Sequence, residues 1–114
     1  MLKKINKWIK IRNENFRNFT KILKRFKNEF VTVHNKEMSP FVLPFLMKDK
    51  EKKVELENYL YKNGIETRPF IAGNLLRQPF LKKFRQSGLI NSDFIEFNTF
   101  YIGNNQFVNK SRLN

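Results

Sequence analysis

The sequence contains no cysteine and one histidine, His34. Without cysteine there is no disulfide framework and no thiolate nucleophile, and a single imidazole is too little for a zinc site. A reducing cytoplasm is the simplest compartment for such a chain. No apolar run reaches the length of a membrane span, and Met1 does not open a signal peptide. We therefore expect a cytoplasmic protein with no membrane partner, in which His34 is a solvated loop residue.

Acidic residues are also scarce, since 10 Asp and Glu stand against 23 Lys and Arg and give a formal net charge of +13. Such a charge attracts phosphates and RNA, so a small basic nucleic-acid-binding protein is one alternative. The basic residues are spread along the whole sequence, however, and no nucleic-acid-binding motif is present. A general compositional bias is the simpler interpretation, and we expect no specific nucleic-acid partner.

Apolar residues are plentiful, and 13 of the 114 residues are phenylalanine. A chain of this length and composition fits one folded domain rather than a disordered segment. In the first part of the chain the apolar residues recur every three or four positions, at Leu2, Ile5, Ile9, Phe16, Phe19, Leu23, Phe26 and Phe30. This spacing predicts one long amphipathic helix over residues 1–30.

That helix would be about 43 Å long, against a diameter of roughly 26 Å for a compact chain of this size. Its apolar stripe therefore needs a partner that the chain itself does not supply. No Ser, Thr, Asp or Asn precedes Leu2 to cap the first amides. We expect the sequence to start inside a helix.

The remainder, residues 31–114, predicts a small α/β domain. Asp49 is a suitable cap for a helix over residues 50–63, and Gly64 is its expected stop. Pro44 lacks an amide donor, which favours an edge position or a bulge for the first strand. The remaining expected elements are strands at 40–47, 65–70 and 99–102, short helices around 79–84 and 91–97, and a last helix capped by Asn109 and cut short.

The order of these elements predicts a roughly three-stranded sheet with helices covering one face. Within it, the run GIETRPFIAGNLLRQP, residues 64–79, closely resembles a segment of the DegT/StrS-type sugar aminotransferase family. It is most similar to the branch containing the pyridoxal-phosphate-dependent deoxysugar 3-dehydratases. FYIGNN, residues 100–105, resembles a second family segment, and residues 2–15 resemble the helix that leads from the large cofactor-binding domain into the small C-terminal domain.

The resemblance implies the small C-terminal domain of the aspartate aminotransferase-like fold, incomplete at both ends and without the large domain. It implies an enzyme that transfers an amino group to a nucleotide-linked keto-deoxysugar, or eliminates a hydroxyl from one, in surface polysaccharide biosynthesis. The cofactor, pyridoxal phosphate, and its lysine belong to the large domain, so we expect no catalytic residue here and no activity from this chain alone. Its expected partners are the nucleotide-linked sugar and the missing large domain or a homodimer partner, and a split-gene subunit is a further alternative.

Two candidate substrate-binding residues lie in the first family segment. Arg68, at the end of an expected strand, could grip a phosphate or carboxylate with its guanidinium fork. The alternative is a salt bridge to Glu66 or Asp93. Asn74 follows a glycine and offers an amide to sugar hydroxyls, and the alternative is an ordinary Asx turn.

Three further candidates are weaker. Arg77 and Gln78 precede an expected helix that begins at Pro79, whose free amides favour a nucleotide phosphate. The alternative for Arg77 is a solvated surface side chain. Asn104 follows Gly103 after the last strand, where ligand clefts often lie, and the alternative is a turn-forming asparagine.

Overall fold

The computed structural model describes residues 2–31, 38–71, 73–84, 88–105 and 107. His34 and the helix predicted at Asn109 lie outside these residues. The elements, in chain order, are a 3-10 turn η1 (Leu2–Lys4), α1 (Ile5–Arg25), β1 (Val42–Leu46), α2 (Lys50–Lys62), β2 (Arg68–Pro69), the 3-10 segments η2 (Leu75–Arg77) and η3 (Pro79–Phe84), α3 (Ile90–Asn98) and β3 (Thr99–Gly103). Within the described ranges, no helix is long and apolar enough to cross a membrane.

The three strands form one antiparallel sheet in the order β1-β3-β2. In this register Leu43 lies opposite Ile102 and Phe45 lies opposite Phe100. Because side chains alternate along a strand, these four residues share one face of the sheet. The predicted α/β class with a three-stranded sheet is confirmed, and Pro44 lies in an edge strand as predicted.

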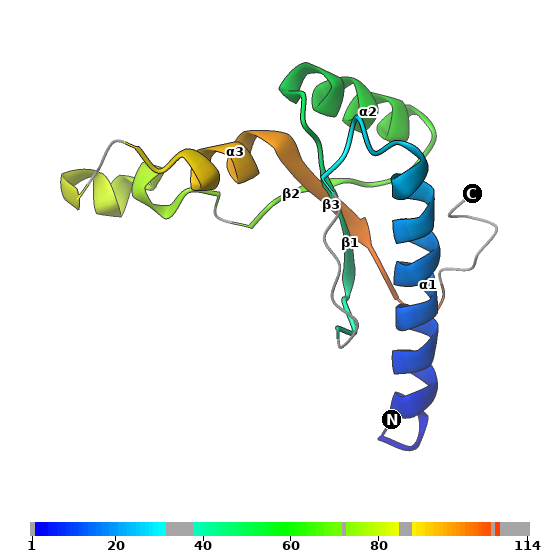
Figure 1. The fold of residues 1–114 in the computed structure, drawn as a ribbon. Coiled ribbons are helices and arrows are strands. Elements are labelled where there is room, and N and C mark those ends of the chain that lie inside the picture. Colours follow the sequence, from blue (N-terminus) through cyan, green and yellow to red (C-terminus); the bar gives the residue numbers. More distant parts are fainter. Residues whose placement is uncertain (1, 32–37, 72, 85–87, 106, 108–114) are drawn as a thin grey trace.

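The core forms where α1 and α2 meet this face. Phe45 lies at its centre: its ring is stacked on Phe100, with centroids 4.7 Å apart, and meets Phe19 edge-on at 5.0 Å. Leu56 and Leu60 of α2 pack against the same cluster. The buried apolar residues are Phe16, Phe19, Leu23, Phe30, Leu43, Met47 and Phe100. In Figure 1, α1 runs beside the sheet and α2 lies at one end of it.

The first helix ends sooner than the predicted residue 30. It ends at Arg25, and Phe26 takes a non-helical conformation with its amide bonded to the Leu23 carbonyl. The chain then turns, and Phe30 pairs with Met47 as an isolated β-bridge. Phe26 and Phe30 fit the helical spacing, so the sequence pattern could not reveal that Phe30 reaches the core from an extended segment.

Only the second half of α1 contacts the core. Toward its N-terminus the apolar stripe is open to solvent, with Leu2 82%, Ile5 45% and Ile9 38% exposed. A stripe of this kind is the surface that a buried neighbour would cover. The expectation that the stripe is not covered from within the chain therefore agrees with the described residues.

The caps of α2 are those predicted. The Asp49 carboxylate accepts a hydrogen bond from the Glu51 amide at 2.8 Å, and Gly64 follows the helix with a φ of 77°. Beyond it the Ile65 amide bonds back to the Leu60 carbonyl at 2.9 Å, which terminates the helix. Ile65 is thereby used by the helix end, so the strand predicted over 65–70 is reduced to β2.

The last helix starts one or two residues before the predicted Asn91 or Ser92. It begins at Ile90, because the Asp93 amide bonds to the Leu89 carbonyl at 3.0 Å and closes the first turn there. The helix predicted after Pro79 is the 3-10 segment η3. Together η2, η3 and α3 project from the sheet as an arm, seen at the left of Figure 1, and the molecule measures 48 × 33 × 26 Å.

Candidate functional site

A hollow lies on the face of the sheet opposite the core. Its volume is about 380 Å³, and it is lined by Phe41, Val42, Glu66, Arg68, Tyr101 and Gly103. Arg68 and Tyr101 face each other across β2 and β3, which places both side chains on this surface. The volume is within the range of small-molecule sites, and one wall is charged while the other is aromatic.

Arg68 is held only loosely by its neighbours. Its Nη2 lies 2.8 Å from Oε1 of Glu66, and its Nε donates to the same oxygen at 3.1 Å. The salt bridge to Glu66 that was one alternative for Arg68 is therefore present. Both side chains are well exposed, at 65% and 75%, and exposed ion pairs contribute only about 0–1 kcal/mol. An anionic ligand can therefore replace Glu66 at the guanidinium at low cost.

Asn74 and Arg77 meet at a different place, on α3. Nδ2 of Asn74 donates to Oδ1 of Asp93 at 2.9 Å, and Nε and Nη2 of Arg77 donate to the same oxygen at 3.2 and 3.0 Å. The hydrogen bonds from Asn74 and from Arg77 lower the pKa of Asp93 from its ordinary value of 3.8. We call this group of three residues the Asp93 clasp.

Further contacts seat the same loop on α3. Nε of Arg77 also lies 2.8 Å from Oε2 of Glu96, and its guanidinium sits over the Phe97 ring at 4.8 Å. Oδ1 of Asn74 accepts from the Leu76 amide at 3.1 Å, which is the Asx turn considered as an alternative for Asn74. Gln78 ends η2, its amide bonded to the Leu75 carbonyl, and is half-buried.

Asn104 lies under α1 and is 1% exposed. Its Nδ2 donates to the Pro40 carbonyl at 2.8 Å and to the Arg12 carbonyl at 3.2 Å, while its Oδ1 accepts from Nδ2 of Asn15 at 3.2 Å. Its amide also bonds to the Phe41 carbonyl. Asn104 thus ties together α1, the segment before β1 and the end of β3. It is turned into the interior rather than toward the hollow.

The five predicted residues therefore occupy three places: Arg68 in the hollow, Asn74, Arg77 and Gln78 on the loop against α3, and Asn104 beneath α1. The sequence did not single out Tyr101 or Phe41 for the hollow, because both have the spacing of core residues. A signal for the Asn104 cluster existed in Asn15, a polar residue that is 4% exposed on the inner side of the amphipathic helix.

Hollows also border α1 in the described part of the chain. One follows the exposed stripe, has a volume of about 330 Å³ and is lined by Leu2, Ile5, Trp8, Ile9, Arg12 and Ser39. Nε of Arg12 is buried and has no hydrogen-bond partner among the described residues. We call this surface the α1 groove. Because it is mostly apolar and holds one unsatisfied donor, it suits a partner that offers apolar side chains and an acceptor.

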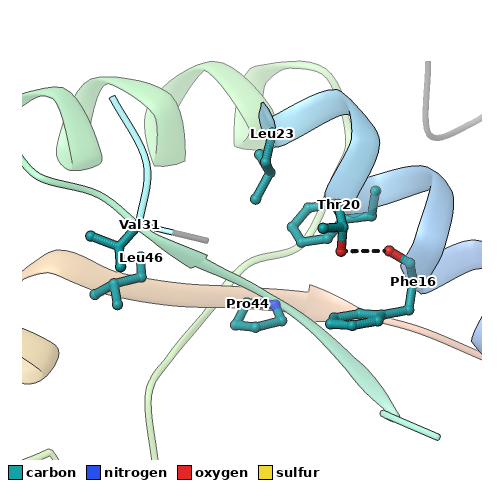
Figure 2. A pocket seen from close by; sticks show the side chains of 7 residues that line it. Phe16, Thr20, Leu23, Val31, Pro44 and Leu46 are labelled. Atoms are coloured by element: carbon teal, nitrogen blue, oxygen red, sulfur yellow. Dashed lines mark hydrogen bonds between the residues drawn. The ribbon is translucent and has the colours of Figure 1, made fainter. Parts of the chain in front are cut away.

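Another hollow, shown in Figure 2, lies between α1 and β1, and its volume is about 20 Å³. Thr20 and Pro44 line it, and the Thr20 hydroxyl donates to the Phe16 carbonyl at 2.9 Å. Such a space holds one water molecule at most. It is a gap in the packing between helix and strand. Within the described ranges, no cluster of acidic, histidine or cysteine side chains could hold a metal ion.

Comparison with known proteins decides the family. A profile of the DegT/DnrJ/EryC1/StrS aminotransferase family matches residues 1–101. The chain belongs to this family. Among curated proteins, none matches it.

Solved structures give the same result. A GDP-4-keto-6-deoxymannose-3-dehydratase with a trapped PLP-glutamate geminal diamine is 26% identical over 98% of this chain, with a TM-score of 0.76. The E. coli GDP-4-keto-6-deoxy-D-mannose-3-dehydratase with hydrated PLP is 26% identical over 98% of the chain, with a TM-score of 0.77. A variant of such a dehydratase with bound GDP-perosamine is 28% identical over 98%, with a TM-score of 0.75.

The chain spans about 31% of the length of the first of these structures and 30% of the second. The predicted family, fold and cofactor class are confirmed, since these relatives hold pyridoxal phosphate. The residues described here do not form a cradle for that cofactor: the hollow has no lysine in its lining, and Lys52, for example, is bound to Glu29 at 2.8 Å on the surface.

Proposed function

We propose that this chain is the small domain of a pyridoxal-phosphate-dependent enzyme that removes the 3-hydroxyl from a nucleotide-linked 4-keto-deoxysugar. The observation that supports this most directly is the likeness to GDP-4-keto-6-deoxymannose 3-dehydratases over 98% of the chain. Amino transfer to a keto sugar is the second candidate, favoured by the family to which the chain belongs. In either case the product is a modified deoxysugar donor for surface polysaccharide synthesis.

In this proposal the hollow contributes to substrate binding rather than to bond breaking. Arg68 provides a guanidinium to the phosphates or to sugar oxygens once Glu66 is displaced, and Tyr101 and Phe41 provide apolar walls for a ring. When bound in the complete enzyme, the cofactor supplies the electron sink for elimination or amino transfer. The contribution of this chain is orientation and specificity.

In this proposal the α1 groove binds the large domain and does not bind the substrate. Its exposed stripe and the unsatisfied Nε of Arg12 form a contact surface for the large domain. Covering Leu2, which is 82% exposed, would stabilise the assembly by up to about 1.5–3 kcal/mol, and covering Ile5 and Ile9, which are already more than half buried, would add less for each residue. The chain would therefore act only together with a large domain.

A chimera tests the proposed function. This chain would replace the corresponding part of a matched 3-dehydratase, and the consumption of GDP-4-keto-6-deoxymannose and the visible absorbance of the cofactor would be measured. We expect turnover with the native chain and a KM at least tenfold higher with Arg68→Ala. Arg17→Ala is the matched control, because Arg17 is an exposed arginine on α1.

A folded chimera that binds the cofactor but leaves the sugar nucleotide unchanged would contradict the dehydratase assignment. Formation of an amino sugar from the same substrate with glutamate present would favour the second candidate instead. An unchanged KM in Arg68→Ala would remove Arg68 from the substrate site.

A further inference from the structure

The loop between β2 and η3 carries three residues that the sequence marked as substrate-binding, and two of them, Asn74 and Arg77, are bound to one carboxylate of the chain itself. We propose that Asp93 is a positioning residue, which fixes the loop over residues 73–78 on α3 and thereby holds β2 and Arg68 in place beside the hollow. This inference rests on the proposed function for the role of Arg68. It assigns Asn74 and Arg77 to the Asp93 clasp instead of to the ligand.

The clasp joins the loop to α3 through several contacts at one carboxylate. One oxygen of Asp93 accepts three hydrogen bonds, one from Asn74 and two from Arg77, at 2.9 to 3.2 Å. Two of them come from a guanidinium, and charge-assisted bonds of this kind are about twice as strong as neutral ones. Asn74 is only 7% exposed, so its amide is committed to these contacts.

The loop also lies unusually close to α3. Gly73 has a φ of 54°, and a Cβ atom at this position would come within 2.7 Å of Cγ of Glu96. The three nearest atoms all belong to the Glu96 side chain, so a larger residue at this position would displace either that side chain or the loop. The positive φ of Gly73 is a second reason why glycine suits the turn that leads into Asn74.

Asp93 lies on a helix that is joined firmly to the sheet. α3 ends at Asn98 and continues directly into β3, and Nδ2 of Asn98 donates to the Met47 carbonyl at 3.0 Å. The helix that carries Asp93 is thus joined to the central strand and to the end of β1. A group held on α3 is held relative to the whole sheet.

β2, by contrast, has little support of its own. It consists of Arg68 and Pro69, which pair with Tyr101 and Phe100, and Pro69 has no amide donor. After β2, the Gly73 amide donates a hydrogen bond to the Phe70 carbonyl at 3.2 Å. The next residue, Asn74, belongs to the Asp93 clasp. The clasp is therefore the second anchor of the segment that carries Arg68, and releasing it should free Arg68 without removing any group from the hollow.

The first test uses the full 114-residue chain labelled with ¹⁵N. In Asp93→Asn we expect the order parameter of the Arg68 amide to fall from about 0.85 toward 0.6, and hydrogen exchange at the Arg77 amide to rise about tenfold. Asp93→Glu keeps the carboxylate and should restore most of the order. Glu55→Gln, at an exposed acid on α2, is the control, and unchanged exchange at Leu43 would verify that the sheet is intact.

Arg77→Lys keeps the charge but not the fork, and serves as a second variant should Asp93→Asn fail to fold. It should loosen Arg68 in the same direction. An Arg68 amide that stays as ordered in a folded Asp93→Asn or Arg77→Lys protein as in the native chain would overturn the proposal.

The second test uses the chimera, where Asp93→Asn should raise KM about fivefold and leave kcat within twofold, with recovery in Asp93→Glu. If Asp93 only supported folding, Asp93→Asn would reduce the folded fraction, which lowers the apparent kcat and leaves KM unchanged. If the native chimera has no activity, the proposed function fails, while the order of Arg68 in the isolated chain still decides whether Asp93 positions it. An unchanged KM in an active Asp93→Asn chimera contradicts the positioning role.

Discussion

Replacing Asn104 with alanine should destabilise the chain strongly although the residue lies next to the end of the sheet. The substitution removes three side-chain hydrogen bonds that join α1, the Pro40 carbonyl and the end of β3. The Arg12 carbonyl retains its bond within the helix, but the Pro40 carbonyl loses its 2.8 Å donor in a site that is 1% exposed.

A buried group left without a partner costs about 1–3 kcal/mol, and the lost packing of the amide adds to this. We therefore expect the free energy of unfolding to fall by about 2–4 kcal/mol. Urea denaturation followed by circular dichroism measures it, with an unchanged m-value showing that only stability has changed. Asn58→Ala, at an exposed position on α2, should change stability by less than about 0.5 kcal/mol.

Asn104→Asp separates hydrogen bonding from packing, because it keeps the shape and replaces the donating group by an oxygen. That oxygen would face the carbonyls of Pro40 and Arg12, so the ionised form should be less stable than the alanine variant. Protonation restores a donor, so the loss should be smaller at low pH. If Asn104→Ala and Asn58→Ala unfold at the same urea concentration, Asn104 does not tie α1 to the sheet.

Three further predictions follow from named contacts. Phe100→Ala removes a fully buried ring stacked on Phe45 and should cost about 3–5 kcal/mol in urea denaturation, so a loss below 1 kcal/mol would place the core elsewhere. Asp49→Ala removes the cap of α2 and should cost about 1 kcal/mol by the same assay, whereas no loss would mean that the cap is not formed in solution. Because the pKa of Asp93 is lowered in the folded chain, its contribution to stability is present above the ordinary value of 3.8 and should be lost as pH falls below it; Asp93→Asn should flatten this part of the melting-temperature profile, and an unaltered profile would contradict the clasp.

The sequence predicted those elements that are determined by residues close to them in the chain. Asp49 and Gly64 lie at the two ends of α2, and Pro44 excludes a central strand, so these features need no knowledge of the rest of the fold. The family motif likewise located Arg68 on the strand that borders the hollow. Such signals act within a few residues of the position they determine.

What the sequence could not supply depends on contacts between distant residues. Asn15 and Asn104 are 89 positions apart, and nothing in either neighbourhood indicates that they bind each other. The ends of α1 and β2 were misjudged for the same reason, since Phe30 is drawn into pairing with Met47 and Ile65 is used by the end of α2. The motif marked Asn74 and Arg77 as candidate substrate-binding residues, and the partner that the structure gives both of them is Asp93.

The proposal that the α1 groove contacts a large domain is open to direct measurement. The 114-residue chain would be mixed with the separately expressed large domain of a matched 3-dehydratase, and their association followed by sedimentation velocity and calorimetry. The account predicts a one-to-one complex that Leu2→Asp weakens at least tenfold, while the chain's own unfolding midpoint stays nearly unchanged because Leu2 is 82% exposed. Absence of a complex, or a complex indifferent to Leu2→Asp, would contradict it.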